Sequence, residues 1–232
     1  YSATVLNTAV NQNGYQLGHT ATLQYRNPVS TALTTRTDTH TLEILEPELD
    51  VDIAFFNDQI LPGDQTYVTL TISHKPTSTG TAFDVDLTND LPIGLQFVSG
   101  SMLTECEDLL AGTPVTTFGS ISAMWDSIPL GVSCQLVYTI QAQESFPPCT
   151  FAENCTSLKF SSCWNTHLDT LSYGPLNPLG VERTGTTIGL NDYNANRCSE
   201  VEVVSPTIST PTIYGAGDVC AGQQLNLFIN QY

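Results

Sequence analysis

Apolar and polar residues alternate in several short runs along the chain. Residues 68–72, 83–87 and 136–140 each follow this two-residue period, which puts one face of a strand on a core and the other in water. Turn-forming residues separate the runs, as at residues 61–64 and 89–92, where proline, glycine and aspartate favour chain reversal. No stretch shows the 3.6-residue period of a long helix. The pattern predicts an all-β protein built as a β-sandwich of short strands.

One of these runs makes a specific prediction about side-chain direction. Its alternation puts Phe83, Val85 and Leu87 on the core and leaves Asp84 and Asp86 in water. We interpret these two carboxylates as ordinary surface, because nothing in the sequence would shift their pKa values for acid–base chemistry.

Two segments far apart in the sequence are similar. Residues 41–47 read TLEILEP and residues 200–206 read EVEVVSP, so each is an alternating strand that ends in proline, with a period of roughly 160 residues. The chain begins without methionine or a signal peptide, and we expect a mature fragment of a longer protein. Residues 1–47 would close a preceding module, residues 48–206 would form a complete module, and residues 207–232 would start another. The alternative is one sandwich with extended ends.

The charge balance excludes some partners. The chain has 23 acidic and 6 basic residues, for a formal net charge of −17. Such a surface repels nucleic acid and anionic membranes. No apolar run reaches the roughly 18 residues that a membrane-spanning helix needs. We therefore expect neither nucleic-acid binding nor membrane insertion.

The seven cysteines contain no C-x-x-C pair, which argues against a zinc ribbon or a thioredoxin-like site. Scattered cysteines in an acidic, strand-rich chain instead indicate disulfides and a secreted, extracellular location, and the alternative is that they are reduced, buried thiols. Six cysteines allow fifteen connectivities. We favour one pair that staples strands around Trp125, one that closes a small loop and one that ties an insertion. These pairs are Cys106–Cys134, Cys149–Cys155 and Cys163–Cys198.

Candidate catalytic residues are few. The four histidines, His19, His40, His74 and His167, lie in Thr- or Ser-rich contexts. The sequence has no H-E-x-x-H motif and no G-x-S-x-G motif. We therefore expect no enzyme activity and no cofactor beyond Ca²⁺.

Two segments are candidate calcium sites. Asp192, Asn194 and Asn196 offer oxygen ligands at alternate positions, although the glycine and the closing acid of an EF-hand loop are missing. The second segment alternates at the predicted module junction and consists of Glu48, Asp50 and Asp52. The alternative for both segments is a strand with a solvated acidic face.

Residues 47–100 resemble a known family. Residues 61–72 read LPGDQTYVTLTI and residues 78–100 read STGTAFDVDLTNDLPIGLQFVSG. This order of turn, strand, strand and turn is similar to the conserved-repeat domain of unknown function in large bacterial and archaeal surface proteins. Residues 73–76, SHKP, replace that family's Asn-x-Gly. The resemblance implies an immunoglobulin-like module in a tandem-repeat protein.

The C-terminal segment carries a second resemblance. Residues 211–227, PTIYGAGDVCAGQQLNL, are similar to the start of Ig-like repeats in giant Bacteroidetes adhesins. In those repeats this cysteine pairs with one on a later strand, which implies that Cys220 is unpaired here and has its partner beyond Tyr232. The resemblance also implies gliding or attachment adhesins and export by the type IX secretion route.

Two covalent modifications can be considered for such a surface protein. Asn154-Cys155-Thr156 is a formal glycosylation sequon, which we interpret as incidental in a bacterium. Lys159 is the candidate for an internal isopeptide bond, which would require this lysine to lie in the core.

The sequence therefore predicts a structural and adhesive segment of a long, secreted cell-surface repeat protein. Its partners would be neighbouring repeats of the same chain and components of the secretion system. Two alternatives remain open at this stage: a subunit of an extracellular filament assembled by strand exchange with other copies, and a module that binds surface glycans or host surfaces.

Overall fold

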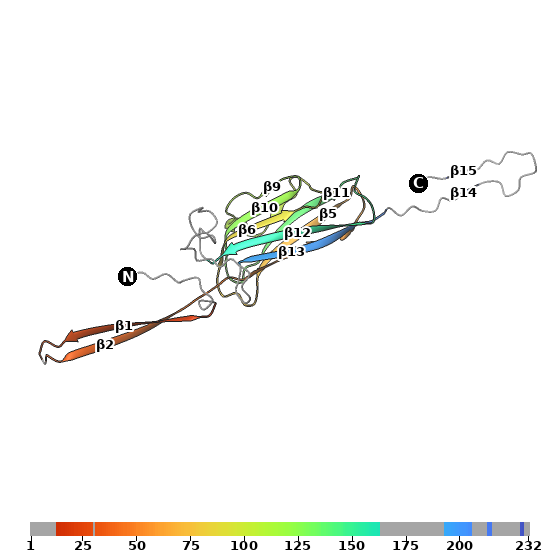
Figure 1. The fold of residues 1–232 in the computed structure, drawn as a ribbon. Helices are drawn as coiled ribbons and strands as arrows, with labels where there is room; N and C mark the ends of the chain where they lie inside the picture. Colours follow the sequence, from red (N-terminus) through yellow and green to blue (C-terminus); the bar gives the residue numbers. More distant parts are fainter. Residues whose placement is uncertain (1–12, 30, 163–192, 206–212, 215–227, 230–232) are drawn as a thin grey trace, which may run out of the picture.

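The computed structural model describes residues 13–29, 31–162, 193–205, 213–214 and 228–229. Two β-sheets pack face to face (Figure 1). The first sheet contains, in spatial order, β4 (Gln59–Ile60), β13 (Asn194–Val203), β12 (Thr150–Ser161), β6 (Ala82–Asp90), β10 (Ser120–Ile128) and β9 (Val115–Thr116). The second contains β3 (Leu49–Phe55), β5 (Gln65–His74), β11 (Cys134–Ala142) and β7 (Leu95–Phe97), and β8 (Leu103–Thr104) also pairs with β11.

The strand order is that of an immunoglobulin-like sandwich. Strands β3, β5 and β11 take the places of A, B and E, and strands β6, β10, β12 and β13 those of C, C′, F and G. The short β4 pairs in parallel with β13, while the other pairs in the sandwich are antiparallel. The predicted all-β, Ig-like fold is confirmed.

Two of the alternating runs form neighbouring strands, as their pattern predicts. Residues 68–72 lie in β5 and residues 136–140 in β11, and the two strands pair directly. Leu70 stands opposite Leu136, and Val68 stands opposite Tyr138. All four side chains are buried, so these cross-strand pairs build the centre of the core.

Strand β6 departs from strict alternation, and the outward direction predicted for Asp84 is wrong. Asp84 has a positive φ of 47°, which produces a bulge where β6 faces β10 and β12. The bulge turns the carboxylate inward, where it accepts a hydrogen bond from the Ser161 hydroxyl at 3.4 Å. Phe83 is consequently only partly buried, while Val85 and Leu87 lie in the core as predicted.

A closed ring of polar groups lies in the core between the two sheets. The Tyr138 hydroxyl donates to Asn89 Oδ1 at 2.6 Å, Asn89 Nδ2 donates to Asn154 Oδ1 at 2.8 Å, and Asn154 Nδ2 reaches the Tyr138 oxygen at 3.4 Å. Burial raises the pKa of Tyr138, so this hydroxyl stays a donor. Because Asn154 is fully buried, the folded module does not expose the formal sequon for glycosylation.

A hairpin stands apart from the sandwich. Strands β1 (Gln16–Arg26) and β2 (Leu33–Glu43) pair along their whole length and extend from one end of the sandwich (Figure 1). Almost every residue of both strands is exposed. A second small pair is β14 (Ile213–Tyr214) with β15 (Phe228–Ile229), and a single 3-10 turn, η1, spans Glu107–Leu109. The assignment of residues 1–47 and 207–232 to neighbouring modules stays a prediction.

Candidate functional site

The base of the hairpin is fastened to the sandwich at Glu46. The Glu46 carbonyl accepts the backbone N–H groups of Thr79 and Gly80 at 2.9 and 3.2 Å. Its buried carboxylate accepts a hydrogen bond from the Tyr193 hydroxyl at 3.2 Å. A side chain at Gly80 would lie 3.4 Å from the Glu46 carbonyl carbon, so glycine permits this close approach. The chain therefore runs from β2 through Glu46, which is held by these hydrogen bonds, into the edge strand β3 of the sandwich.

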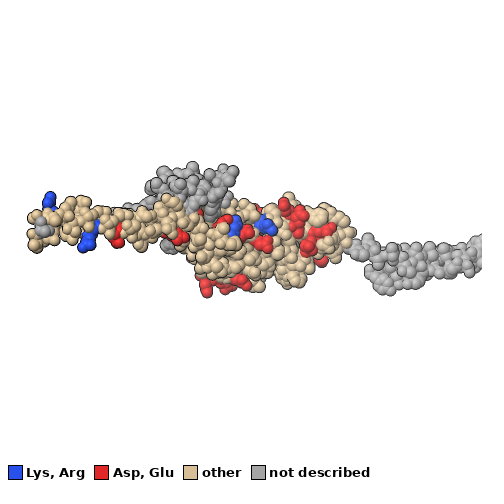
Figure 2. Space-filling model, turned by 90° about the horizontal axis from the view of Figure 1, so that it is seen from below, with Lys and Arg blue, Asp and Glu red and all other residues tan. Residues whose placement is uncertain are grey.

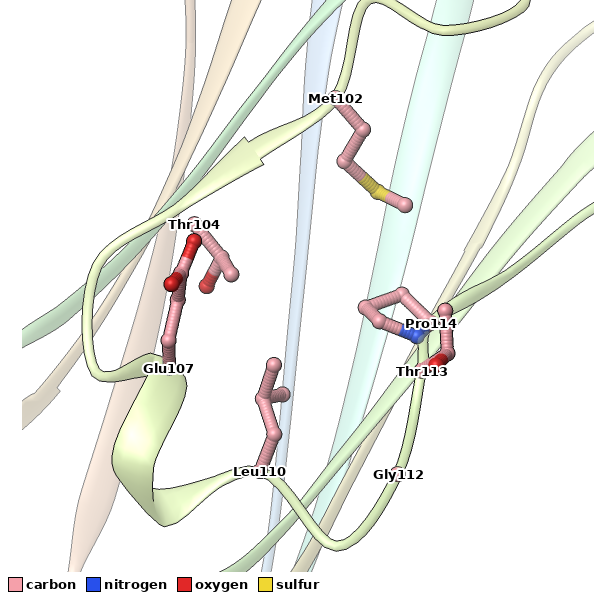
Figure 3. A pocket seen from close by; sticks show the side chains of 7 residues that line it. All are labelled: Met102, Thr104, Glu107, Leu110, Gly112, Thr113 and Pro114. Carbon is pink, nitrogen blue, oxygen red and sulfur yellow. The ribbon is translucent and has the colours of Figure 1, made fainter.

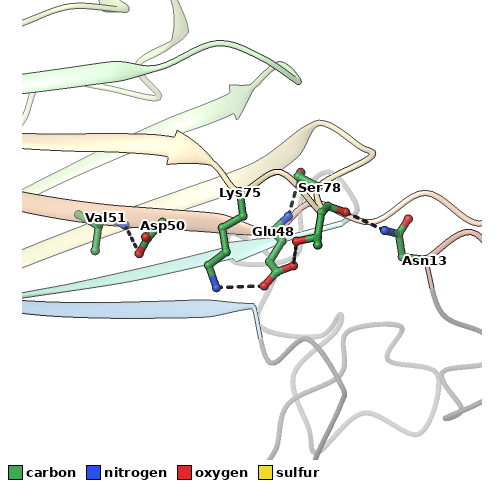
Figure 4. Close-up of polar contacts among 7 residues, drawn as sticks. Asn13, Glu48, Asp50, Val51, Lys75 and Ser78 are labelled. Atoms are coloured by element: carbon green, nitrogen blue, oxygen red, sulfur yellow. Dashed lines mark hydrogen bonds and ion pairs between the residues drawn. The ribbon is translucent and has the colours of Figure 1, made fainter.

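A second set of contacts surrounds Glu48, directly after the hairpin (Figure 4). Lys75 Nζ lies 3.0 Å from Glu48 Oε1, and the Thr77 hydroxyl donates to the other carboxylate oxygen. The Thr77 hydrogen bond, together with Lys75, lowers the pKa of Glu48. On the hairpin side, Asn13 Nδ2 donates to the Thr77 carbonyl at 2.9 Å. The turn at residues 75–80 thus links both ends of the hairpin to the sandwich.

The same region contains a serine–histidine pair, which sequence reasoning did not single out. His74 Nε2 lies 3.1 Å from the Ile128 carbonyl, which can only accept, so in the neutral ring Nδ1 accepts from the Ser78 hydroxyl at 2.7 Å. Such a pair can form a nucleophile and its base. Here Ser78 is buried and its Oγ also accepts the Glu48 N–H at 3.0 Å. The pair therefore holds the turn in place and offers no substrate access.

The predicted calcium ligands do not converge among the described residues. Glu48 is engaged by Lys75 and Thr77, Asp50 accepts the Val51 N–H at 3.0 Å, and Asp52 lies 3.6 Å from Arg197 Nε. In the described part of the chain, the one group of three metal-ligand side chains is Glu153, Cys155 and Cys198. Its two cysteines are joined in a disulfide.

The other calcium segment is only partly described. Asn194 and Asn196 lie on β13, and Asp192 is outside the described residues. Calcium binding at either segment stays a prediction.

Two disulfides among the described residues cross-link the sandwich. The predicted Cys106–Cys134 pair is present, with its Cα atoms 5.7 Å apart, and it ties the η1 loop to β11. The predicted pairings of Cys155 and Cys198 are wrong: these two residues face each other on β12 and β13 and are bonded to one another. Cys149 is exposed and free, whereas Cys163 and Cys220 are outside the described residues. Cys155 and Cys198 are bonded because the register of β12 and β13 places them opposite each other. The spacing of cysteines in the sequence does not reveal that register.

Lys159 does not lie in the core. It is exposed on β12, where it stands opposite Asp86 of β6. Since an isopeptide bond requires a buried lysine beside its partner, this placement removes Lys159 as a candidate.

The short second strand of the sandwich, β4, runs beside the last strand, β13, in the same direction. Strand β13 pairs in parallel with β4, which directly follows β3. The Glu202 N–H donates to the Asp58 carbonyl at 2.7 Å, and the Val204 N–H donates to the Ile60 carbonyl at 2.9 Å. The chain consequently enters the sandwich at the hairpin end and leaves β13 at the opposite end (Figure 1).

A surface pocket lies between the η1 turn and residues 112–114 (Figure 3). Its volume is about 550 Å³, and it is lined by both apolar and polar side chains. Glu107 is its one charged residue, so the pocket lacks the paired titratable groups of an acid–base site. The lining residues are Met102, Thr104, Glu107, Leu110, Gly112, Thr113 and Pro114.

Charge is unevenly distributed over the molecule. Acidic side chains are spread over the sandwich, and basic side chains mark the far part of the hairpin (Figure 2). The hairpin strands carry Arg26 and Arg36 against Asp38 and Glu43, so the hairpin is neutral overall. No helix among the described residues is long and apolar enough to cross a membrane.

Comparisons with known proteins show no family membership. No family model matches the chain, and no curated protein matches it. Solved structures give distant likenesses. BcpA, the major pilin subunit of Bacillus cereus, is 12% identical with a TM-score of 0.43, covering 81% of this chain and 48% of BcpA, about half its length.

Two other solved structures show how varied these likenesses are. The collagen-binding domain from a Staphylococcus aureus adhesin is 10% identical with a TM-score of 0.36, covering 64% of this chain and 95% of that domain. AvmM, which catalyses macrocyclisation in alchivemycin A biosynthesis, is 8% identical with a TM-score of 0.41, covering 69% and 91%. Since all three TM-scores are low and one protein is an enzyme, function has to come from this chain's own geometry.

Proposed function

We propose that this chain is a non-enzymatic, tension-resisting module of a long extracellular adhesin. The observation that carries the proposal is the parallel pairing of β4 with β13, with entry and exit at opposite ends of the sandwich. A module in a surface fibre is pulled through these two ends when the fibre is stretched. The relative direction of β4 and β13 then decides how the module resists.

Tension loads the β4–β13 pair in shear. The pull on the entering chain passes through β3, which is paired with β5, and reaches β4. There it acts in the opposite direction to the pull on β13, along two parallel strands. The hydrogen bonds from Glu202 to Asp58 and from Val204 to Ile60 must therefore break together. The side-chain hydrogen bond from Gln59 Nε2 to Glu202 Oε2, at 2.8 Å, crosses the same pair. A sheet peeled from one end would instead lose its bonds one at a time.

The two disulfides limit how far the module can extend after this pair breaks. Cys155–Cys198 spans 43 residues and Cys106–Cys134 spans 28 residues. At about 3.5 Å per extended residue, the two bonds withhold roughly 150 Å and 100 Å of chain. This suits a fibre outside the cell, where disulfides persist.

Single-molecule pulling in two geometries tests the proposal. Handles at residues 46 and 205 load β4 and β13 in shear, while handles at residues 48 and 75 peel β3 from β5, whose ends lie together at Leu49 and His74. We expect the rupture force in the first geometry to be at least about twofold higher, because forced unfolding follows the barrier in the pulled direction. Equal forces in both geometries would contradict the proposal.

A binding role is the second candidate, and one observation favours it. Phe56 and Tyr67 are both exposed, with ring centroids 6.2 Å apart and ring planes at 80°. Exposed aromatic faces suit recognition of glycans or other amphipathic surfaces. If this role is correct, Phe56→Ala and Tyr67→Ala abolish binding on a glycan array, whereas Phe151→Ala, at another exposed aromatic residue, leaves it unchanged.

The finer parts of the proposal rest on sequence resemblance. These are the gliding or attachment type of adhesin and export by the type IX route. Surface exposure itself can be measured by brief proteolysis of intact cells. Release of peptides from this chain by an added protease is the expected result, and recovery only after lysis would contradict an extracellular location.

A further inference from the structure

The β1–β2 hairpin has two chemically different faces. Residues paired across the two strands share a face, so Leu17 lies beside Leu42, and Leu23 lies beside Arg36. On β1 this first face is mainly apolar, with Leu17, His19, Ala21, Leu23 and Tyr25. On β2 the same face is mixed, with Thr34, Arg36, Asp38, His40 and Leu42. The second face consists mainly of threonines, paired as Thr20–Thr39, Thr22–Thr37 and Thr41 opposite Gly18. Half-apolar strands of this kind normally cover a core with their apolar face.

The hairpin matches the β12–β13 pair of the sandwich in register. Both β2 and β13 lead into a proline, Pro47 and Pro206, and aligning these prolines places Glu43 on Glu202. The strand pairings then fix which residues of β1 and β12 correspond, with no further choice. The correspondence between the hairpin and the β12–β13 pair therefore rests on the alignment of the two prolines and on the strand register within each pair.

Two corresponding positions agree in chemistry but differ in burial. Leu23 takes the place of Leu158, and Tyr25 takes the place of Phe160. Leu158 and Phe160 are 0% and 3% exposed, whereas Leu23 and Tyr25 are 62% and 42% exposed. These two core-covering positions of β12 are thus repeated in β1 without a core beneath them. The other three positions of the face differ in residue type, with Leu17, His19 and Ala21 on Ala152, Asn154 and Thr156.

A cross-strand pair supports the same alignment. Thr20 and Thr39 fall on the positions of Cys155 and Cys198. The two threonine hydroxyls lie 3.3 Å apart and form a hydrogen bond, where the sandwich has its disulfide. Each residue pair lies on the side away from the apolar face. The threonines link β1 to β2, and the cysteines link the corresponding strands β12 and β13.

The structure assigns an occupant to the apolar face of the hairpin. We infer that Leu17, Leu23, Tyr25 and Leu42 close the core of a preceding β-sandwich of the same kind in the same polypeptide, as β12 and β13 close this one. The inference rests on the proposed multi-module fibre and names its neighbour. A second copy of this chain cannot be that neighbour, because its own β12 and β13 already occupy the position that the hairpin would take in its sheet.

Charge is consistent with this neighbour. The hairpin strands are neutral, and their two arginines would meet a sandwich that carries an acidic excess if the preceding module resembles this one (Figure 2). Fastening of the hairpin base at Glu46 and Asn13 would then join the two modules rigidly, because β2 continues from one core into the edge of the next.

Chemical labelling of the natural polypeptide tests the inference. In a Cys149→Ser background, which removes the one free thiol among the described residues, Leu23→Cys reports on the apolar face and Thr22→Cys on the threonine face. Peptide mass spectrometry reads the label at each of these two positions separately from any other cysteine. We expect maleimide to label position 23 at least about tenfold more slowly than position 22 in the natural polypeptide, because local opening limits access to a buried thiol. In the 232-residue chain both positions should label at similar rates.

A second measurement needs no mutation. Hydroxyl-radical footprinting of the wild-type polypeptide should protect Tyr25, with the exposed Tyr67 as the internal reference. Equal labelling at positions 22 and 23 together with an oxidised Tyr25 would overturn the inference, as would a natural polypeptide that has no module before the hairpin. Protection that increases with protein concentration would point to a second copy and overturn it too. The pulling experiment on the sandwich does not involve the hairpin face, so either proposal can fail alone.

Discussion

The β12–β13 pair and the β1–β2 hairpin are similar strand pairs, but only the β12–β13 pair has a core beneath it. Both pairs are long, antiparallel and apolar on one face. In β12 that face is buried under the second sheet, and the pair is cross-linked; in β1 the same face is exposed. A two-stranded hairpin alone is marginally stable in water. Backbone pairing therefore defines the shape of both pairs, whereas burial and the disulfide stabilise only the β12–β13 pair.

The largest expected effect compares two equivalent leucines. Leu158→Ala should destabilise the sandwich by about 2–5 kcal/mol, since it empties part of a closed core. Leu23→Ala in the same chain should change the free energy of unfolding by at most about 0.5 kcal/mol, because its side chain is exposed. Urea unfolding followed by the fluorescence of the buried Trp125 measures both. Similar losses for the two variants would break the comparison.

The disulfide position gives the next effect. Replacing Cys155 and Cys198 by serine should cost about 4 kcal/mol, from the chain entropy of a loop closed across 43 residues. Thr20→Cys with Thr39→Cys should form a new disulfide, since these residues stand directly opposite each other. That bond should slow amide exchange in the hairpin and leave unfolding of the sandwich unchanged. If the two cysteines fail to bond, this position of the hairpin does not have the geometry of the Cys155–Cys198 position, and the equivalence of the two strand pairs is contradicted.

Breaking the polar ring around Tyr138 should have a smaller effect on the free energy of unfolding, and that effect should depend on pH. Tyr138→Phe should cost about 1–3 kcal/mol, because Asn89 loses a buried donor. Burial raises the pKa of Tyr138 above its usual value of 10, so the unfolded chain ionises first as the pH rises. Wild-type stability should be unaffected by this group below pH 10 and should fall above it. The phenylalanine variant should lose that part of the alkaline slope in urea titrations.

The smallest effect is expected at the hairpin base. The Thr77 hydrogen bond and Lys75 lower the pKa of Glu48 below 4.5, so the stability it contributes is present above that pH and is lost as the pH falls through the lowered value. Solvent screens this partly exposed pair, and Glu48→Gln should cost at most about 1 kcal/mol at neutral pH. Asp50→Asn, next along the same strand face, is the control. Equal acid sensitivity in both variants would show that Glu48 has no special role.

Local pattern predicted most of the sandwich and little of its cross-linking. Alternation at residues 68–72 and 136–140 located two central strands, because a half-buried sheet imposes that period on side chains. The bulge at Asp84 escaped prediction, since a single positive φ reverses the side-chain order without changing the residue types. The Cys155–Cys198 bond depends on how strands far apart in the chain align, and that register is set by packing of the whole core.

The contacts around the hairpin base were likewise invisible in the sequence. Glu48, Asp50 and Asp52 alternate as calcium ligands would, yet each carboxylate has its own neighbour in the folded chain. The similarity of residues 41–47 to residues 200–206, by contrast, gave the alignment on which the equivalence of the two pairs depends.

The account's central claim is that β4 and β13 resist tension in shear, and one pulling comparison tests it most directly. Glu202→Pro removes the N–H that binds the Asp58 carbonyl, whereas Glu200→Pro changes the same strand two residues earlier, facing the same way but outside the pairing with β4. With both variants pulled from residues 46 and 205 and their urea stabilities measured, we predict that only Glu202→Pro lowers the rupture force. A rupture force that is unchanged in Glu202→Pro, or lowered equally in both, would contradict the account.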